Sequence, residues 1–323
     1  MADPTLYLLG GGSFAPPAHA VRDVAARLGA SAADYRGWDR FCQATDDDHP
    51  STMASEAVRR ALAAAGRAPT DLRLVVHAGA SRDYLPSWSV AIEIARLLGA
   101  GPGCLGLDLT AGCVGTLAAL ELARTWLAGN GGGCAAIAAA ERWAHTIARD
   151  DPRQSRVWSH SDGAGALIAT SEPTAGAPAF LGACFYTRAD LNDHVFVEYG
   201  GTRNPVAPPG QDPHARRLST RSAQDILEIY RAGYQAAFTM MCERFACRPT
   251  RLVCNQVSPK VVEMLREICG LAADAVIVTG PELGHQGAAD VLVALERLGR
   301  GTGEQVAIAS SAPYAFGFGA IVA

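Results

Sequence analysis

The sequence predicts an α/β fold with mainly parallel strands that helices cover on both faces. Apolar segments of strand length alternate with longer helical patterns along the chain, as expected when β-α units build a sheet. Several of the strand segments are apolar throughout, which is typical of strands buried on both faces. With 323 residues, 49% of them hydrophobic, the chain is long enough for one large core or two fused halves.

The first half of the chain contains three predicted helices among five predicted strands. Ser51 is the expected N-cap of the first helix, and Gly66 is its expected stop. The helix that begins at Cys113 is nearly apolar all round until Glu121, which indicates a buried helix. The predicted strands cover residues 6–12, 72–80, 104–110, 133–141 and 162–170, and the predicted helices cover residues 51–66, 87–100 and 113–129.

The second half repeats this plan, and both halves finish alike, with "DGAGALIA" at 162–169 and "FGFGAIVA" at 316–323. Such a repeat indicates duplication of one α/β unit, so we expect halves at 1–171 and 172–323. The predicted strands cover residues 179–188 and 251–257 and the paired strands of 305–323, and the predicted helices cover residues 223–245, 258–270 and 288–299.

Residues 189–222 lie between the two halves and are rich in proline, glycine, arginine and histidine. Such a composition is typical of a surface connection, because these residues punctuate regular structure. We expect an exposed loop or flap that contributes nothing to the core.

The charge pattern excludes several classes of partner. The formal net charge is −4 and no run of lysine or arginine occurs, so no nucleic-acid partner is expected. The sequence contains no stretch of about 18 uninterrupted apolar residues, so no membrane span is expected. The N-terminal segment lacks the basic start and apolar length of a signal peptide, so we expect a cytoplasmic protein.

The nine cysteines form no CxxC pair with a matching Cys or His pair, so neither a zinc site nor any other metal site is expected. Their odd number and the expected reducing compartment argue against a disulfide framework. Most are expected to be small buried hydrophobic residues. Cys254 stays open as a functional residue because it ends a predicted strand beside Asn255 and Gln256.

Cys113 is the candidate nucleophile. In "LDLTAGCVGTLAALELA" an apolar strand runs into a short turn, then the cysteine, then a helix. A helix N-terminus stabilises a thiolate through its dipole and its unpaired N–H groups. Gly112 and Gly115 leave room for an acyl carbonyl, and the backbone N–H of Cys113 is a candidate oxyanion donor.

His285 and Asp290 are the candidate base and its orienting acid. In "LGHQGAAD" a histidine lies in a glycine-flanked turn, and an aspartate follows where a helical pattern begins. Two structural alternatives remain: a satisfied core or surface histidine, and a first-turn acid favoured by the helix dipole. The other histidines are expected to be structural, His160 least clearly because it borders "SDGAGA".

Four segments together resemble the ketoacyl-ACP synthase III family of the thiolase fold. They are the strand-Cys-helix at Cys113, "SDGAGALIA", "LVCNQVSPKVVEML" and "GHQGAAD", in the order of that family. The resemblance covers nearly the whole chain. It implies a homodimer of five-layered αβαβα subunits built from two duplicated halves, with a Cys-His-Asn catalytic set that needs no bound cofactor.

The sequence departs from that family at both polar partners. Cys113 falls on the family's cysteine, but Asn255 stands where the family has histidine, and His285 stands where it has asparagine. A subgroup of synthase III-like acyltransferases, from polyketide and glycoside tailoring pathways, resembles this pattern more closely. The resemblance implies a Cys113-His285-Asp290 set, with Asn255 as a hydrogen-bond donor near the acyl oxygen.

The remaining site predictions also follow from the resemblance. The C-terminal turn contains Pro313, which has no N–H, so Tyr314 becomes the second oxyanion donor. Trp38, with Arg40 nearby, is the nearest counterpart of the family's coenzyme A-gripping pair. Leu85 matches an apolar residue that reaches toward the partner subunit's acyl pocket.

Arg153, between Arg149 and Arg156, is a candidate contact for a phosphopantetheine arm or an acidic carrier protein. The alternative is an ordinary solvated loop.

Together these features predict an acyltransferase of natural-product biosynthesis that acts through an S-acyl-Cys113 intermediate. The donor is an acyl-phosphopantetheine on an acyl carrier protein, or acyl-CoA. The acceptor is a carrier thiol or the hydroxyl of a small molecule such as a sugar or an alcohol. A decarboxylating synthase that primes a polyketide chain, a silent subunit of a heteromeric synthase and a thioesterase remain as alternatives.

Overall fold

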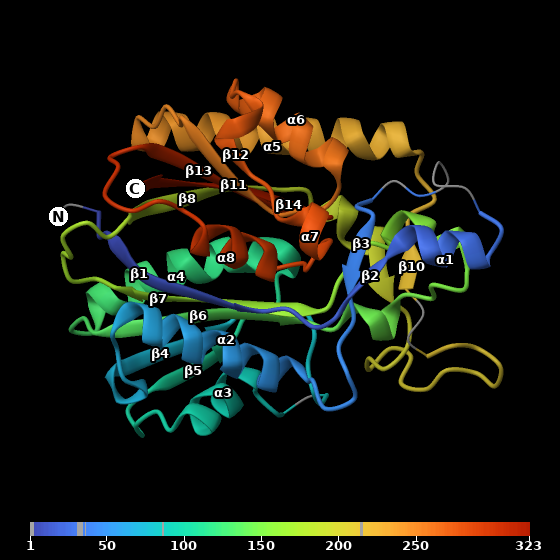
Figure 1. Cartoon of the computed structure of the whole chain (residues 1–323), viewed down its shortest axis with the longest axis horizontal. Coiled ribbons are helices and arrows are strands. Elements are labelled where there is room, and N and C mark those ends of the chain that lie inside the picture. The colour runs from blue at the N-terminus through green and yellow to red at the C-terminus, as the bar shows by residue number, and fades with distance from the viewer. Residues whose placement is uncertain (1–2, 31–34, 36, 86, 214–215) are drawn as a thin grey trace.

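The computed structural model describes residues 3–30, 35, 37–85, 87–213 and 216–323, and these form the predicted α/β fold. Five layers follow one another across the molecule (Figure 1): outer helices α2 and α3, a sheet, central helices α4 and α8, a second sheet, and outer helices α5 and α6. The helices are α1 Val21–Arg27, α2 Pro50–Ala65, α3 Val90–Leu98, α4 Gly115–Gly129, α5 Ala223–Phe245, α6 Pro259–Cys269, α7 Gly280–Leu283 and α8 Ala289–Glu296. The predicted αβαβα architecture is confirmed.

The strands of the two layers are continuous through hydrogen bonds, in the order β12-β11-β13-β14-β8-β1-β7-β6-β4-β5. They are β1 Leu6–Phe14, β4 Leu72–His77, β5 Leu105–Asp108, β6 Cys134–Glu141, β7 Gly163–Thr170, β8 Ala179–Thr187, β11 Arg251–Cys254, β12 Val276–Ile277, β13 Gln305–Ala312 and β14 Ala315–Val322. A short ribbon of β2 Ala18–Ala20 and β3 Arg40–Cys42 lies outside them.

The strand directions correct one prediction. β4 pairs in parallel with β5 and β6, and β11 pairs in parallel with β12 and β13. The other neighbouring pairs are antiparallel, so the sheets are mixed, not mainly parallel. β6 and β7 are buried at every residue, and strands covered on both faces read as apolar runs whichever way they pair.

The strand order is the same in the two parts of the chain. The first part has the order β5-β4-β6-β7-β1, and the second has β12-β11-β13-β14-β8. Helices α4 and α8 follow corresponding strands, β5 and β12, and meet in the middle layer (Figure 1). The boundary between residues 171 and 172 falls in the connection from β7 to β8 and stays a prediction.

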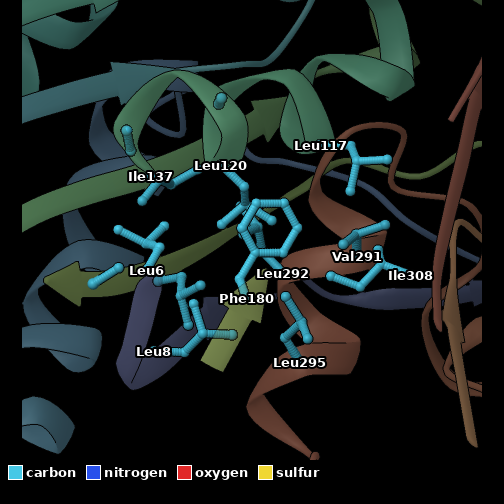
Figure 2. Packing of buried hydrophobic residues seen from close by; sticks show 14 of the residues in the cluster. Leu6, Leu8, Leu117, Leu120, Ile137, Phe180, Val291, Leu292, Leu295 and Ile308 are labelled. Atoms are coloured by element: carbon cyan, nitrogen blue, oxygen red, sulfur yellow. The ribbon is translucent and has the colours of Figure 1, made fainter. Parts of the chain in front are cut away.

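The largest hydrophobic cluster fills this middle layer (Figure 2). Leu117 and Leu120 of α4 face Leu292 and Leu295 of α8, with Phe180 of β8 between them. Burying such side chains stabilises the fold by about 1.5–3 kcal/mol each. The packing fixes the N-termini of both central helices, and the predicted burial of the 113–129 helix is confirmed.

Two predictions of local structure have different outcomes. The first long helix begins at Pro50 with His49 as its N-cap, so the assignment of Ser51 as N-cap is wrong. The Ser51 hydroxyl instead donates to Asp83 at 2.7 Å. Gly66 ends the helix in the left-handed conformation, as predicted. Within the described residues, the helices lack the combination of length and hydropathy that a membrane span requires.

The segment 189–222 is more ordered than predicted. It contains a 3-10 helix, Ala189–His194, and a two-stranded ribbon of β9 Val195–Val197 and β10 Arg216–Leu218. The side chains of Leu191 and Arg216 are buried. The expectation of a wholly exposed flap is therefore wrong, because tertiary contacts hold this ribbon against the rest of the molecule.

Candidate active site

Cys113 lies where β5 passes into α4. A 3-10 turn, Gly112–Val114, precedes the first residue of α4, so the cysteine stands just before the helix N-terminus. Gly112 has φ +58°, and a Cβ there would lie 2.9 Å from the Ala312 Cβ, so the turn requires glycine. The carbonyl of Cys113 accepts a hydrogen bond from Ser310 Oγ at 2.7 Å. This anchors the half-buried cysteine to β13.

His285 lies against Cys113 although the two residues are far apart in the sequence. Its Nε2 is 3.8 Å from Cys113 Sγ. Its backbone N–H donates to Ser159 O, and its carbonyl accepts from Ser161 N, both at 2.8 Å. The preceding Gly284 has φ +72°, and a Cβ there would lie 2.5 Å from the Ser159 carbonyl oxygen. The His285 loop is therefore tightly fixed against the segment before β7.

Asp290, in the first turn of α8, binds the other nitrogen of the ring. Its Oδ2 lies 2.5 Å from His285 Nδ1. The carboxylate also accepts backbone N–H bonds from Gln256 at 2.6 Å and Gln286 at 2.7 Å. It is almost wholly buried, and three donors converge on it. This arrangement assigns the Nδ1 proton to His285 and leaves Nε2 facing the sulfur.

The electrostatics of this pair favour a charged imidazole. Burial alone lowers the pKa of His285, but the Asp290 carboxylate and the Cys113 sulfur together raise it to about 10. His285 is therefore protonated near neutral pH. An imidazolium beside the sulfur stabilises the thiolate that a nucleophile requires.

Asn255 is wholly buried and bonded to the end of β13. Its Nδ2 donates to the Ser311 carbonyl at 3.3 Å, and its Oδ1 accepts from the Tyr234 hydroxyl at 3.1 Å. Ser311 Oγ lies 2.8 Å from the same hydroxyl. Asn255 is therefore bonded to Ser311, the neighbour of Ser310, and the Ser310 hydroxyl donates to the Cys113 carbonyl.

Tyr314 lies in the turn between β13 and β14. Its carbonyl accepts from Arg188 N at 2.7 Å, and its hydroxyl lies 3.7 Å from where a Gly112 Cβ would be. Burial and then the charge of Cys113 raise the pKa of the Tyr314 hydroxyl. The Tyr314 side chain therefore lies beside the cysteine turn, and the role of its backbone N–H as an oxyanion donor stays a prediction.

The three residues predicted to bind substrate differ in their surroundings. Trp38 is 9% exposed, and its indole N–H donates to the Gln256 carbonyl at 2.7 Å. It therefore contacts the same residue whose backbone N–H binds Asp290, and its assignment as a surface for coenzyme A stays a prediction. Leu85 is 65% exposed. Arg153 is exposed and pairs with Asp151 at 2.9 Å.

Two residues near His285 were missed by sequence reasoning. The His160 ring lies edge-on to the His285 ring, with 4.7 Å between the centroids. Arg216 Nη1 lies 3.0 Å from His160 Nδ1. The position of His160 beside "SDGAGA" was a weak signal, but nothing in the sequence distinguishes Arg216 from its neighbour Arg217.

The other cysteines do not share the surroundings of Cys113. All nine are free thiols. Burial, followed by the charge of Asp290, raises the pKa of Cys254, which opposes a role as nucleophile. Among the described residues, no group of three or more His, Cys, Asp or Glu side chains is arranged to hold a metal ion.

Comparison with known proteins places this geometry in context. No protein-family model matches the chain. The sequence is 27% identical over 257 residues to beta-ketoacyl-[acyl-carrier-protein] synthase III of Sphingopyxis alaskensis, covering 78% of this chain and 76% of that protein. It is 28% identical over 262 residues to the mycobacterial beta-ketoacyl-[acyl-carrier-protein] synthase III of Mycobacterium bovis, covering 79% and 74%.

The structural likenesses extend over the whole chain. A variant of OleA from Xanthomonas campestris superimposes with a TM-score of 0.85 at 18% identity and covers 100% of both chains. 3-Oxoacyl-(acyl carrier protein) synthase III from Pseudomonas aeruginosa gives 0.83 at 20% identity and covers 98% of both chains. The structures show the thiolase fold, and the sequence similarity to synthase III supports an acyl-transferring enzyme.

Proposed function

We propose that the protein is an acyltransferase that carries an acyl group on Cys113 between a thioester donor and a second acceptor. One observation carries the proposal: Cys113 Sγ, both ring nitrogens of His285 and the Asp290 carboxylate form one chain, with separations of 3.8 and 2.5 Å. This is the arrangement of a nucleophile, a base and an orienting acid.

The first step loads the enzyme. The Cys113 thiolate attacks the thioester carbonyl of the donor, and a new C–S bond forms as the donor's C–S bond breaks. The departing thiolate takes the proton of the His285 imidazolium. The products are S-acyl-Cys113, a neutral His285 and the free donor thiol.

The second step transfers the acyl group. The acylated sulfur has no charge, so its contribution to the raised pKa of His285 disappears. The neutral ring then accepts the proton of an acceptor O–H or S–H as the acceptor oxygen or sulfur attacks the acyl carbonyl. The Cys113 thiolate leaves, and the ion pair is restored.

Three groups are proposed to assist both steps. The backbone N–H groups of Cys113 and Tyr314 bind the oxyanion that forms at the acyl carbonyl. Asn255 supplies a further hydrogen bond near the acyl oxygen, and its fixed amide supports this role. Preorganised donors of this kind lower the barrier because they need no reorganisation during the reaction.

The donor is proposed to be an acyl carrier protein or acyl-CoA, which approaches past Arg153. Arg153 lies at a pocket of about 330 Å³, and its guanidinium group suits the phosphate of a phosphopantetheine arm. The exposed Leu85 supports a homodimer in which this side chain meets the partner's acyl pocket. The proposed setting is natural-product biosynthesis in the cytoplasm.

Decarboxylative condensation is the second candidate, because the sequence relatives are ketoacyl synthases. The exchange of residues at Asn255 and His285 favours simple transfer. This chain has asparagine where that family has histidine and a charged histidine where that family has asparagine. Release of carbon dioxide from a malonyl donor in the presence of an acyl donor would favour condensation instead.

Intact-protein mass spectrometry with a panel of acyl thioesters tests the proposal. Wild-type protein should gain one acyl group, and Cys113→Ala should gain none. Cys104→Ala is the matched control, because Cys104 is also a partly exposed thiol and should label normally. Wild-type protein that stays unlabelled with every donor would exclude the proposed mechanism.

A further inference from the structure

A buried cation lies close to His285, and the two proposed steps give it no role. Arg216 is 8% exposed. Its Nη1 contacts His160 Nδ1 at 3.0 Å, and its Nη2 donates to Thr146 Oγ1 at 2.9 Å. The guanidinium also lies over the Trp143 ring, 4.4 Å from its centroid. These contacts are to a histidine, a hydroxyl and an aromatic face.

His160 does not supply a compensating negative charge. Burial, and then the charges of His285, Arg216 and Arg149, lower the pKa of His160 well below its ordinary value. The ring is therefore neutral and accepts the Arg216 proton at Nδ1. Within the described ranges, no carboxylate lies within ion-pair distance of Arg216, whereas the adjacent Arg217 pairs with Glu198 at 2.5 Å.

A buried cation without an anionic partner is costly, because it has lost water and gained no opposite charge. Burial lowers the pKa of Arg216 to about 10, and the charges of Cys113 and Glu141 act in the opposite direction. The charge of the nucleophile thus reaches this guanidinium. An anion bound here would balance the charge of the guanidinium and would lie close to the reacting sulfur.

The position of Arg216 restricts what that anion can be. One histidine ring separates the guanidinium from His285, and His285 lies 3.8 Å from Cys113 Sγ. Arg216 also lines the pocket that reaches the exposed Arg153. The phosphate of a phosphopantetheine arm is many bonds from its sulfur, so an anion at Arg216 must lie within a few bonds of the reacting carbonyl or hydroxyl.

We infer that Arg216 binds a carboxylate carried by one of the two substrates. The carboxylate belongs either to the far end of a dicarboxylic acyl group or to an acceptor that is itself an acid. The planar donor fork of a guanidinium fits a carboxylate in a bidentate manner. This inference rests on the proposed function, since it names the class of substrate that the Cys113 site takes.

With a dicarboxylic donor, the loading step forms and breaks the same bonds as with any other thioester. The Cys113–acyl C–S bond forms, the donor's C–S bond breaks, and the donor thiolate takes the His285 proton. No C–C bond breaks, so the far carboxylate stays on the acyl group and keeps its charge beside Arg216. The mass of the adduct therefore reports whether the carboxylate has been retained.

The first arm of the test measures loading of Cys113 by intact-protein mass spectrometry. Malonyl-CoA and succinyl-CoA are compared with the uncharged acetyl-CoA and butyryl-CoA. Arg216→Gln should slow loading by the charged donors by roughly 10- to 100-fold and should leave the neutral donors unchanged. Arg216→Lys should recover part of the loss. Arg231→Gln, at an exposed arginine of α5 that pairs with Glu267, should change neither.

The second arm measures transfer from protein preloaded with an acetyl group. Lactate is compared with lactamide, in which a neutral amide replaces the carboxylate. A selective loss of transfer to lactate in Arg216→Gln assigns the carboxylate to the acceptor, and a selective loss in the first arm assigns it to the donor.

Equal losses for charged and neutral substrates in both arms would assign Arg216 a purely structural role and overturn the inference. No change in either arm would overturn it as well. In both of these cases wild-type protein is still acylated, so the proposed function survives. Wild-type protein that no donor acylates would overturn both the function and the inference that rests on it.

Discussion

The two halves of the molecule place different chemistry at corresponding points of the same framework. In the first half, β5 leads through the Cys113 turn into α4. In the second half, β12 leads through α7 and the His285 loop into α8. The repeated strand order brings the two helix N-termini together in the middle layer, so Cys113 and His285 meet across the halves. The shared framework therefore supplies proximity, and the residues at each junction supply the chemistry.

The two junctions also differ in how tightly they hold the functional side chain. The sulfur of Cys113 is half-buried, and its residue is anchored through its carbonyl to Ser310. The ring of His285 is buried, and both its Nδ1 and its backbone are hydrogen-bonded. A nucleophile must be reached by substrate, whereas a base must keep one tautomer and one orientation. The contrast therefore agrees with the proposed roles.

Removing the base should have the largest effect. In His285→Ala we expect transfer from preloaded acyl-Cys113 to fall by roughly 10²- to 10⁴-fold, because a positioned general base contributes that much. Loading should persist at a reduced rate, since the sulfur remains. The measurement is the decay of the acyl adduct by mass spectrometry after acceptor is added. His19→Ala, at an exposed histidine that stacks on Phe41, is the control, and equal decay in both variants would remove His285 from the mechanism.

Neutralising the orienting acid should have a smaller effect. In Asp290→Asn we expect transfer to fall by roughly 10²-fold, because an amide does not fix the Nδ1 proton or balance the imidazolium. The matched control is Glu93→Gln, which removes a first-turn acid from α3. The same rate assay applies to both variants. If Asp290→Asn is as mild as this control, Asp290 is only a first-turn helix charge.

The pH dependence of stability tests the ion pair in the second half. The pKa of His285 is raised from 6.5 to about 10, so its stabilising contribution is complete below 6.5 and is lost as the pH rises toward about 10. The advantage of wild type over His285→Gln in unfolding free energy should therefore shrink by up to about 1.4 kcal/mol per pH unit across that window. Urea unfolding at several pH values measures the difference, and a constant difference would mean that the ring is uncharged in the folded protein.

Local patterns in the sequence predicted much of this site. Cys113 follows a strand and precedes a helix, and both features belong to a continuous stretch of chain. His285 and Asp290 are five residues apart, so the turn between them determines whether they meet. The four segments of the family resemblance added the relation between the two junctions, which no single segment contains.

The features that were missed depend on contacts between distant segments. Trp38 donates to Gln256 across 218 positions of sequence, so its aromatic pattern alone cannot tell a ligand surface from a core support. Arg216 is buried because its ribbon packs against His160, while Arg217 on the same ribbon faces solvent. Strand direction was missed for the same reason, since burial on both faces removes the alternation that reports it.

The smallest expected effect compares the two junctions through one glycine from each. Gly112 and Gly284 both have positive φ, so alanine costs each about 1–2 kcal/mol in backbone strain. A Cβ at Gly112 would meet the Ala312 methyl at 2.9 Å, whereas a Cβ at Gly284 would meet the backbone oxygens of Arg40 and Ser159 at 2.5 Å. A methyl group can shift more readily than two backbone carbonyls that belong to fixed segments. Gly284→Ala should therefore lower the unfolding free energy by about 1 kcal/mol or more beyond Gly112→Ala, as urea unfolding of the two variants would measure. Equal losses would mean that the backbone of the His285 loop is no more rigid than that of the Cys113 turn. The difference in how tightly His285 and Cys113 are held would then have to come from side-chain hydrogen bonds alone.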